Sequence, residues 1–117
     1  DDQHGTAIVV LAGLINSLKL VKKKIDEIKL VMNRAGAAGL SVAKLLITYG
    51  VKNFIICDTK GAIYRDRKDG MNEFKLQLAM LSNENQVKGS LEEVIKGADV
   101  FIGLSSGGAL NGFSRDI

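Results

Sequence analysis

The 117-residue sequence contains no proline, no tryptophan, one histidine and one cysteine, and aromatic residues make up only 5% of it. The single cysteine, Cys57, excludes an internal disulfide and is typical of a protein in a reducing compartment. It lies in an apolar run, so we interpret it as an inert strand residue and not as a nucleophile. No group of His, Cys, Asp or Glu residues has the spacing of a zinc site.

Long hydrophobic runs and a strong net charge are also absent. The apolar stretch 7–18 is short for a membrane span, and Asn16 and Ser17 interrupt it. No signal peptide is recognisable, so we expect a cytoplasmic protein without a membrane partner. The net charge is +3, and the one basic run, Lys22 to Lys24, has no aromatic residues interleaved with it. We interpret this run as a solvated loop and expect no nucleic-acid partner.

The composition, 46% hydrophobic and 25% charged, is that of a soluble globular domain. We expect a single partial domain over residues 1–117, with a leading helix and linker at 1–27 and the main core at 28–117. The sequence begins with Asp1-Asp2, and its last residues, 115–117, resemble the start of a new helix. We therefore expect a domain truncated at both ends.

The hydrophobic periodicity predicts strands that alternate with helices. Apolar residues from Ile8 to Leu18 recur at helical spacing, with Thr6 as a candidate N-cap. Strands are expected at 29–33, 53–57 and 100–104. A helix is expected after the glycine-rich turn, ended by Gly50, with an apolar face made of Leu40, Ala43, Leu46 and Ile47. Two more helices are expected, one after the candidate cap Asn72 up to 81 and one from the capping box Ser90–Glu93 to Ile95. This order predicts an α/β fold of the Rossmann type, with a parallel sheet and helices on both faces.

The most informative segment is Val31 to Gly39, an apolar run that enters a glycine-rich turn and opens a helix. A second apolar run follows and ends in Asp58, nineteen residues after Gly39. This arrangement is typical of a dinucleotide-binding βαβ unit. Gly36 and Gly39 would let a pyrophosphate reach the N–H groups of the helix start, and Asp58 would accept hydrogen bonds from the ribose hydroxyls.

Each of these residues has an alternative role. Gly36 and Gly39 could simply allow close packing of helix and strand, and Asp58 could cap the turn that follows it. Arg34 occupies the position of the first glycine of G-x-G-x-x-G. Its Cβ would strain the turn if φ must be positive, whereas its guanidinium could pair with a phosphate.

Small residues follow the third predicted strand. The loop from Ser105 to Gly108 lies where ligands of open α/β sheets bind, although it could be an ordinary tight turn. At the other end, Asp1-Asp2 could be an exposed terminus, or could supply a ligand for a hard cation and a partner for a catalytic lysine. His4 alone is more typical of a surface residue than of a metal ligand.

Four segments carry a resemblance to a known family, and together they span essentially the whole chain. Residues 1–7 resemble the Asp-Asp-x-x-Gly-Thr segment of bacterial-type malic enzymes, and 33–39 resemble that family's Asn-Gly-Ala-Gly-Ala-Ala-Gly, with arginine for the first glycine. Residues 57–64 are similar to its Asp-Ser-Lys-Gly segment, and 96–103 also resemble the family. Ser105-Ser106-Gly107-Gly108 departs from the family's Ser-Ala-Pro-Gly.

The resemblance implies the NAD(P)-binding part of an enzyme that oxidises and decarboxylates malate to pyruvate, with NAD or NADP and with Mg²⁺ or Mn²⁺. It implies that Asp2 is a metal ligand and that Asp1 lies beside a catalytic lysine. It also implies that Gly36, Ala37, Ala38, Gly39 and Asp58 hold the dinucleotide. We expect three further residues to contact the cofactor, at positions that depart from the family's pattern: Arg34, Ser105 and Ser106. The family's remaining catalytic residues would lie outside this chain, and a homodimer or larger homo-oligomer is expected.

Two other functions stay open at this point. Another dehydrogenase on the same fold, of the amino-acid dehydrogenase type, would also use the glycine turn and Asp58. A non-catalytic nucleotide-binding domain would explain Arg34 as a residue that has weakened dinucleotide binding.

Overall fold

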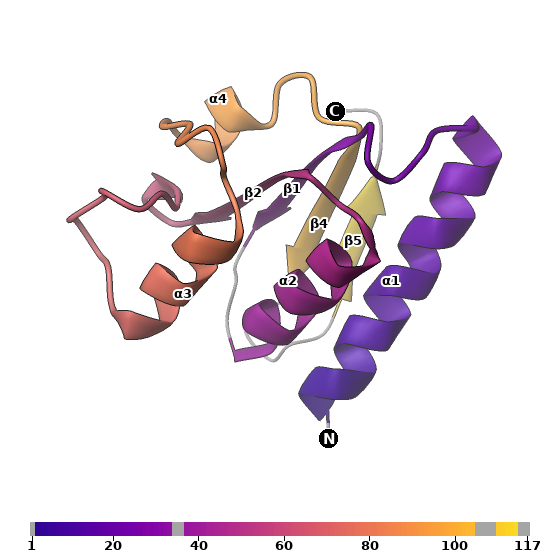
Figure 1. Ribbon diagram of the computed structural model, residues 1–117, viewed down its shortest axis with the longest axis horizontal. Coiled ribbons are helices and arrows are strands. Elements are labelled where there is room, and N and C mark those ends of the chain that lie inside the picture. The colour runs from indigo at the N-terminus through magenta and orange to yellow at the C-terminus, as the bar shows by residue number, and fades with distance from the viewer. Residues whose placement is uncertain (1, 34–36, 105–109, 115–117) are drawn as a thin grey trace.

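The protein folds around one five-stranded sheet with the strand order β3-β2-β1-β4-β5 (Figure 1). The computed structural model describes residues 2–33, 37–104 and 110–114. The strands are β1 (Lys29–Asn33), β2 (Asn53–Asp58), β3 (Gly61–Ala62), β4 (Val100–Leu104) and β5 (Leu110–Ser114). The helices are α1 (Asp2–Val21), α2 (Ala37–Tyr49), α3 (Glu73–Leu81) and α4 (Leu91–Val94).

The three strands expected from the sequence form the parallel centre of the sheet. β1 pairs in parallel with β2 on one side and with β4 on the other, so Asn33 lies opposite both Cys57 and Gly103. The Rossmann-type α/β class is therefore confirmed. Two edge strands, β3 and β5, pair antiparallel with β2 and β4 and were not predicted. β3 has only two residues, too few to show an alternating pattern.

Helices cover both faces of the sheet, but unequally. Leu30 and Met32 of β1 point into a core that the buried sides of α1, α2 and α3 share, and both are fully buried. Val31 points to the other face, where Val94 of the short helix α4 belongs to the same apolar cluster. β1 is thus enclosed on both faces, as its continuous apolar sequence predicts.

Helix α1 begins at Asp2, so the prediction of an N-cap at Thr6 was wrong. The helix packs on α2 through Ala7, Val10, Leu14 and Leu18, which all belong to the main core. No proline stands between Asp2 and Thr6 to prevent a helical backbone, so the helix can begin before the candidate cap.

The other predicted helix boundaries depend on local chemistry and are confirmed. Gly50 follows α2 with a φ of +121°, a backbone conformation that residues other than glycine rarely adopt. Asn72 caps α3 by accepting a hydrogen bond from the Lys75 amide. Ser90 and Glu93 form the reciprocal capping box that begins α4.

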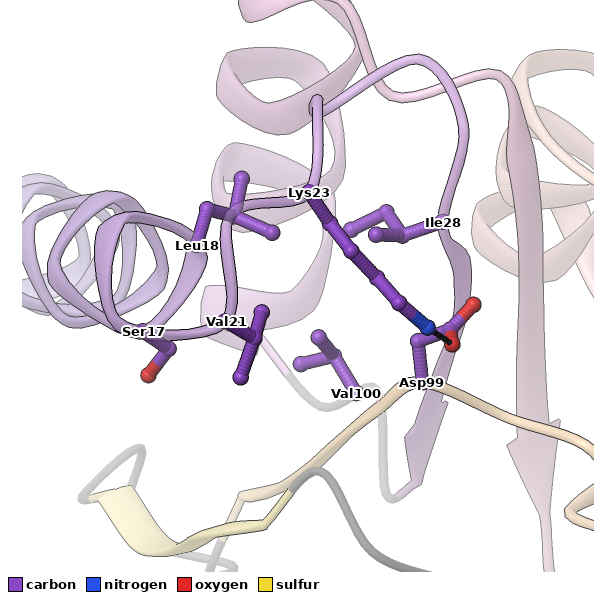
Figure 2. Close-up of a pocket in the computed structure, with 7 residues that line it drawn as sticks. All are labelled: Ser17, Leu18, Val21, Lys23, Ile28, Asp99 and Val100. Atoms are coloured by element: carbon purple, nitrogen blue, oxygen red, sulfur yellow. Dashed lines mark hydrogen bonds and ion pairs between the residues drawn. The ribbon is translucent and has the colours of Figure 1, made fainter.

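An ion pair between Lys23, which follows α1, and Asp99, which precedes β4, connects these two segments. Figure 2 shows Lys23 extended toward Asp99 beside a small pocket of about 60 Å³ that is lined largely by apolar side chains. Asp99 also accepts a hydrogen bond of 2.9 Å from the Lys29 amide at the start of β1. One residue of the basic run predicted to be a solvated loop is therefore held by a specific contact. The pocket lies at the N-terminal ends of the parallel strands, away from the edge where ligands of such sheets bind.

The turn into β3 depends on a close approach of two backbone segments. Gly61 has φ +102°, and a Cβ placed on it would lie 2.2 Å from the carbonyl oxygen of Gly89. The neighbouring Ala62 amide donates a 2.9 Å hydrogen bond to that same oxygen. Only glycine fits this turn, since both the backbone conformation and the contact exclude a side chain.

We expect Gly61→Ala to lower the free energy of unfolding by about 2–3 kcal/mol, because backbone strain and the clash with Gly89 both oppose folding. Gly97→Ala is the matched control: Gly97 also has a positive φ, of +77°, but nothing lies within 4 Å of its Cβ position. Gly97→Ala should lower the free energy of unfolding by only about 1 kcal/mol. Urea unfolding of both variants measures the difference, and equal losses would contradict the role of the contact.

Candidate functional site

The candidate site lies at the edge of the sheet where β1, β2 and β4 end. β2 and β4 flank β1 on opposite sides. The connection that follows β1 therefore leads to the strand on one side, and the later connection into β4 leads to the other side. In open α/β sheets a crevice forms at this reversal, and ligands bind there. Asp58 lies one residue beyond the Cys57–Asn33 pair, and α2 begins at Ala37, four residues after β1 ends.

The structure describes some of the predicted site residues and not others. Ala37, Ala38 and Gly39 form the first turn of α2, and Gly39 is buried. Asp2 is the first residue of α1, whose N-terminal end lies toward the same end of the molecule as the start of α2 (Figure 1). The remaining predicted residues lie outside the described residues: Asp1, Arg34, Gly36, Ser105 and Ser106.

Asp58 is the candidate site residue whose side-chain contacts are best defined. Arg67 donates hydrogen bonds to its carboxylate from both terminal nitrogens, from Nη1 to Oδ1 at 2.9 Å and from Nη2 to Oδ2 at 2.5 Å. Lys75 Nζ lies 2.8 Å from Oδ2, and the Lys60 amide donates a 2.9 Å hydrogen bond to Oδ1. The Asp58 side chain is only 12% exposed, so this ion pair is largely removed from solvent.

These contacts control the charge of Asp58. Burial alone would raise the pKa of the carboxyl group, but hydrogen bonds from Arg67, Lys75 and the Lys60 amide together hold that pKa well below its usual range. The pKa of Arg67 is raised, chiefly by its hydrogen bonds to Asp58. The bond from the Lys60 amide is the turn-capping contact considered as an alternative, and it coexists with the ion pair.

Cys57 directly precedes this carboxylate but has no nucleophilic character. The thiol is fully buried, and burial followed by repulsion from Asp58 raises its pKa to about 11. A thiol with such a pKa is almost entirely protonated at neutral pH. The structure agrees with the interpretation of Cys57 as an inert strand residue.

Arg67 and Lys75 are the residues that the sequence did not reveal. Arg67 comes from the charged loop after β3, where Arg65, Asp66 and Lys68 are exposed. Lys75 lies in the first turn of α3 and also donates to the Gly70 carbonyl oxygen at 3.1 Å. From sequence alone, a charged residue in a charge-rich loop is predicted to be exposed to solvent, because its partner in the folded protein is not known.

Comparison with known proteins shows which family the chain belongs to. The family profile described as "Malic enzyme, NAD binding domain" matches residues 3–117. The chain belongs to this family. It is 56% identical over 110 residues to a bifunctional malic/malolactic enzyme of Bacillus subtilis and 47% identical over 113 residues to an NADP-dependent malic enzyme of Rhizobium meliloti. These alignments cover 94% and 95% of this chain.

A solved structure supports the same assignment. The NAD-dependent malic enzyme of Thermotoga maritima superimposes with a TM-score of 0.85 and 45% identity over 90% of this chain. The chain spans 28% of that protein, and 27% and 14% of the Bacillus and Rhizobium relatives. The malic enzyme resemblance is confirmed, and neither the amino-acid dehydrogenase nor the non-catalytic domain is favoured.

Two features are absent from residues 2–33, 37–104 and 110–114. Within these ranges no helix combines the length and apolar character needed to cross a membrane. No three His, Cys, Asp or Glu side chains come together as a metal site there.

The Asp58 contacts predict how stability changes with pH. A carboxyl group with a lower pKa in the folded state stabilises the fold above its unfolded pKa of about 3.9, and this stabilisation is lost as the pH falls further. We expect the free energy of unfolding to fall by about 1–2 kcal/mol between pH 5 and pH 2 because of this group. Urea unfolding measured across this range should show a smaller fall in the free energy of unfolding for Asp58→Asn than for the wild type. An identical pH dependence in both proteins would remove Asp58 as the cause.

Proposed function

We propose that this chain is the NAD(P)-binding part of an enzyme that oxidises and decarboxylates malate to pyruvate. The observation that carries the proposal is the position of Asp58 at the carboxyl end of β2, beside the end of β1, in a chain of the malic enzyme family. This is where a carboxylate meets the adenosine ribose of a dinucleotide. When bound, the dinucleotide supplies the hydride acceptor, and the protein supplies binding and orientation.

The first turn of α2 is suited to the pyrophosphate. Ala37, Ala38 and Gly39 carry no side chain longer than a methyl group, and the first N–H groups of a helix have no partner within it. The positive end of the helix dipole adds a favourable interaction with an anion. We propose that Arg34, Gly36, Ser105 and Ser106 complete the contacts from the two loops at this edge.

Ribose binding at Asp58 requires an exchange of partners. A carboxylate has about four acceptor positions, and four donors already occupy them. Lys75 is the donor best placed to leave, because its side chain is 25% exposed and the Gly70 carbonyl oxygen remains available to it. Arg67 is 6% exposed and has no comparable freedom.

The same contacts explain why an acid at Asp58 need not select NAD over NADP. A carboxylate at this position normally favours a free 2′-hydroxyl, because it repels a 2′-phosphate. Here Arg67 and Lys75 contribute two positive charges against one negative charge within contact distance. We therefore propose NAD or NADP as the cofactor, in keeping with relatives named for each.

We propose that the intact enzyme also uses Mg²⁺ or Mn²⁺, to which this chain contributes one ligand, Asp2. The described residues do not form a metal site by themselves, so the other ligands would come from elsewhere in the protein. Asp1 would lie beside the catalytic lysine. A cytoplasmic homodimer or larger homo-oligomer belongs to the same proposal, and sedimentation of the intact protein tests the assembly.

Asp58→Ala should weaken NAD binding to the intact protein by about 1–3 kcal/mol, the usual loss when hydrogen bonds to a charged group are removed. Isothermal titration calorimetry measures the dissociation constant, and melting temperature checks that the variant is folded. An unchanged dissociation constant would limit Asp58 to capping the turn and would contradict the proposed site.

Asp2→Asn should weaken the binding of Mn²⁺ to the intact protein at least tenfold, because an amide is a poorer ligand than a carboxylate for a hard cation. Calorimetric titration with Mn²⁺ gives the affinity directly, and the metal dependence of malate oxidation gives a second measurement. The substitution should leave NAD binding unchanged. The same Mn²⁺ affinity in both proteins would exclude Asp2 as a ligand.

A further inference from the structure

An open hollow lies between the C-terminal ends of α1 and α2, and we call it the α1–α2 hollow. Its volume is about 390 Å³, which is within the range of about 300–1,000 Å³ that is usual for small-molecule sites. Two of the residues that line it, Ile25 and Tyr49, shortly precede β1 and β2 in the chain. The hollow therefore lies at the N-terminal ends of these strands, whereas the candidate cofactor site lies at their carboxyl ends.

Apolar side chains form one part of the wall of the hollow: Ile15, Leu18, Ile25 and Tyr49. Leu18 is buried in the main core, and Ile25 packs against that core from outside. Ile25 also lies close to the end of α2, since a Cβ placed on Gly50 would be 3.2 Å from its Cγ2 atom. Tyr49 is 54% exposed, and a half-exposed tyrosine presents apolar ring surface to a ligand while its hydroxyl stays in water.

Three lysines form the rest of the wall, Lys19, Lys22 and Lys23, and no acidic side chain of the described residues lines it. Asp99 offsets the charge of Lys23. Within residues 2–33, 37–104 and 110–114, neither Lys19 nor Lys22 forms an ion pair. The C-terminal ends of α1 and α2 each contribute about half a negative charge. A net charge of about +1 remains at the hollow, which favours a ligand with a single negative charge.

The backbone of Lys22 adopts a conformation that lysine disfavours. Its φ is +58°, and the next amide, that of Lys23, donates a 3.2 Å hydrogen bond to the Leu18 carbonyl oxygen. This bond closes the end of α1 in a motif that usually has glycine in the left-handed position. The helix dipole explains a lysine in the last turn, such as Lys19, but not a lysine in place of that glycine. A strained lysine beside an apolar hollow points to a role in binding.

We propose that the α1–α2 hollow binds an organic carboxylate that has an apolar body. The carboxylate lies between Lys19 and Lys22, and the apolar body covers Leu18, Ile25 and the ring of Tyr49. An uncharged apolar compound leaves the two lysines without a partner, and a small anion leaves the apolar wall in water. The inference does not depend on the proposed function, because none of these residues belongs to the candidate cofactor site.

Calorimetric titration of the intact protein tests the inference, with octanoate below its micellar concentration as the probe. Acetate, which has the charge without the apolar body, and octan-1-ol, which has the body without the charge, are the matched ligands. The wild type should bind octanoate roughly tenfold or more tightly than either. Equal affinity for octanoate and one of the matched ligands would overturn the inference, as would the absence of octanoate binding.

Substitution of the lysines locates the binding site. The double variant Lys19→Met and Lys22→Met should bind octanoate about tenfold more weakly, because two exposed ion pairs are lost. Lys24→Met is the matched control, because Lys24 is an exposed lysine of the same basic run that does not line the hollow. This control should bind octanoate as the wild type does. An equal loss in both proteins would show general attraction by positive charge and would overturn the inference.

Lys22→Gly separates binding from folding. Glycine adopts a positive φ without strain, so the melting temperature of this variant should stay the same or rise. Its affinity for octanoate should nevertheless fall about threefold, because one of the two lysines is lost. A purely structural role of Lys22 would leave the affinity unchanged, and that result would overturn the inference.

Competition distinguishes the hollow from the proposed catalytic site. Saturating NAD and malate should leave the affinity for octanoate unchanged, because the hollow lies at the opposite ends of the strands. Displacement of octanoate by NAD or by malate would place it in the cofactor or substrate site and would overturn the inference. Wild-type protein that binds octanoate but neither NAD nor NADP would contradict the proposed function and would support this inference.

Discussion

The position of β1 between two parallel partners is the constraint on which the site depends. Leu30, Val31 and Met32 are fully buried, and hydrogen bonds on both sides set the register of β1 against β2 and β4. A shift of one residue would turn these side chains to the wrong face of the sheet. The same register places Asp58 one residue beyond the end of β1, so the packing of the core also sets where this carboxylate lies at the edge of the sheet.

The sequence predicted those elements whose signals are local. Continuous apolar runs predicted β1 and β4 with the bounds that the structure has, and predicted β2 one residue too short, because the strand ends at Asp58. Asn72, the Ser90–Glu93 box and Gly50 marked helix ends because each satisfies or terminates a helix within a few residues. The start of α1 was mispredicted because threonine, a common N-cap, also occurs inside helices, and the residues before Thr6 contain no proline that would stop the helix.

The edge strands escaped prediction for a related reason. β3 consists of Gly61 and Ala62, which have low strand propensity and pair with β2 because the turn at Gly61 folds them back. β5, which includes a glycine, pairs with β4 through an irregular register between Gly103 and Leu104. Neither strand has the alternation or the continuous apolar run that identifies a strand in sequence.

At the site, the spacing from Gly39 predicted where Asp58 would lie but not what would surround it. Arg67 and Lys75 come nine and seventeen positions later, from a loop and a helix that only the fold brings to β2. Their contacts change the chemistry of the position: an isolated carboxylate would repel a phosphate, whereas this one has two cations beside it. The identity of the acid at the end of the second strand is therefore not enough to infer the cofactor. Under the proposed function, the charges of all the groups that contact this acid would determine how the position responds to a 2′-phosphate.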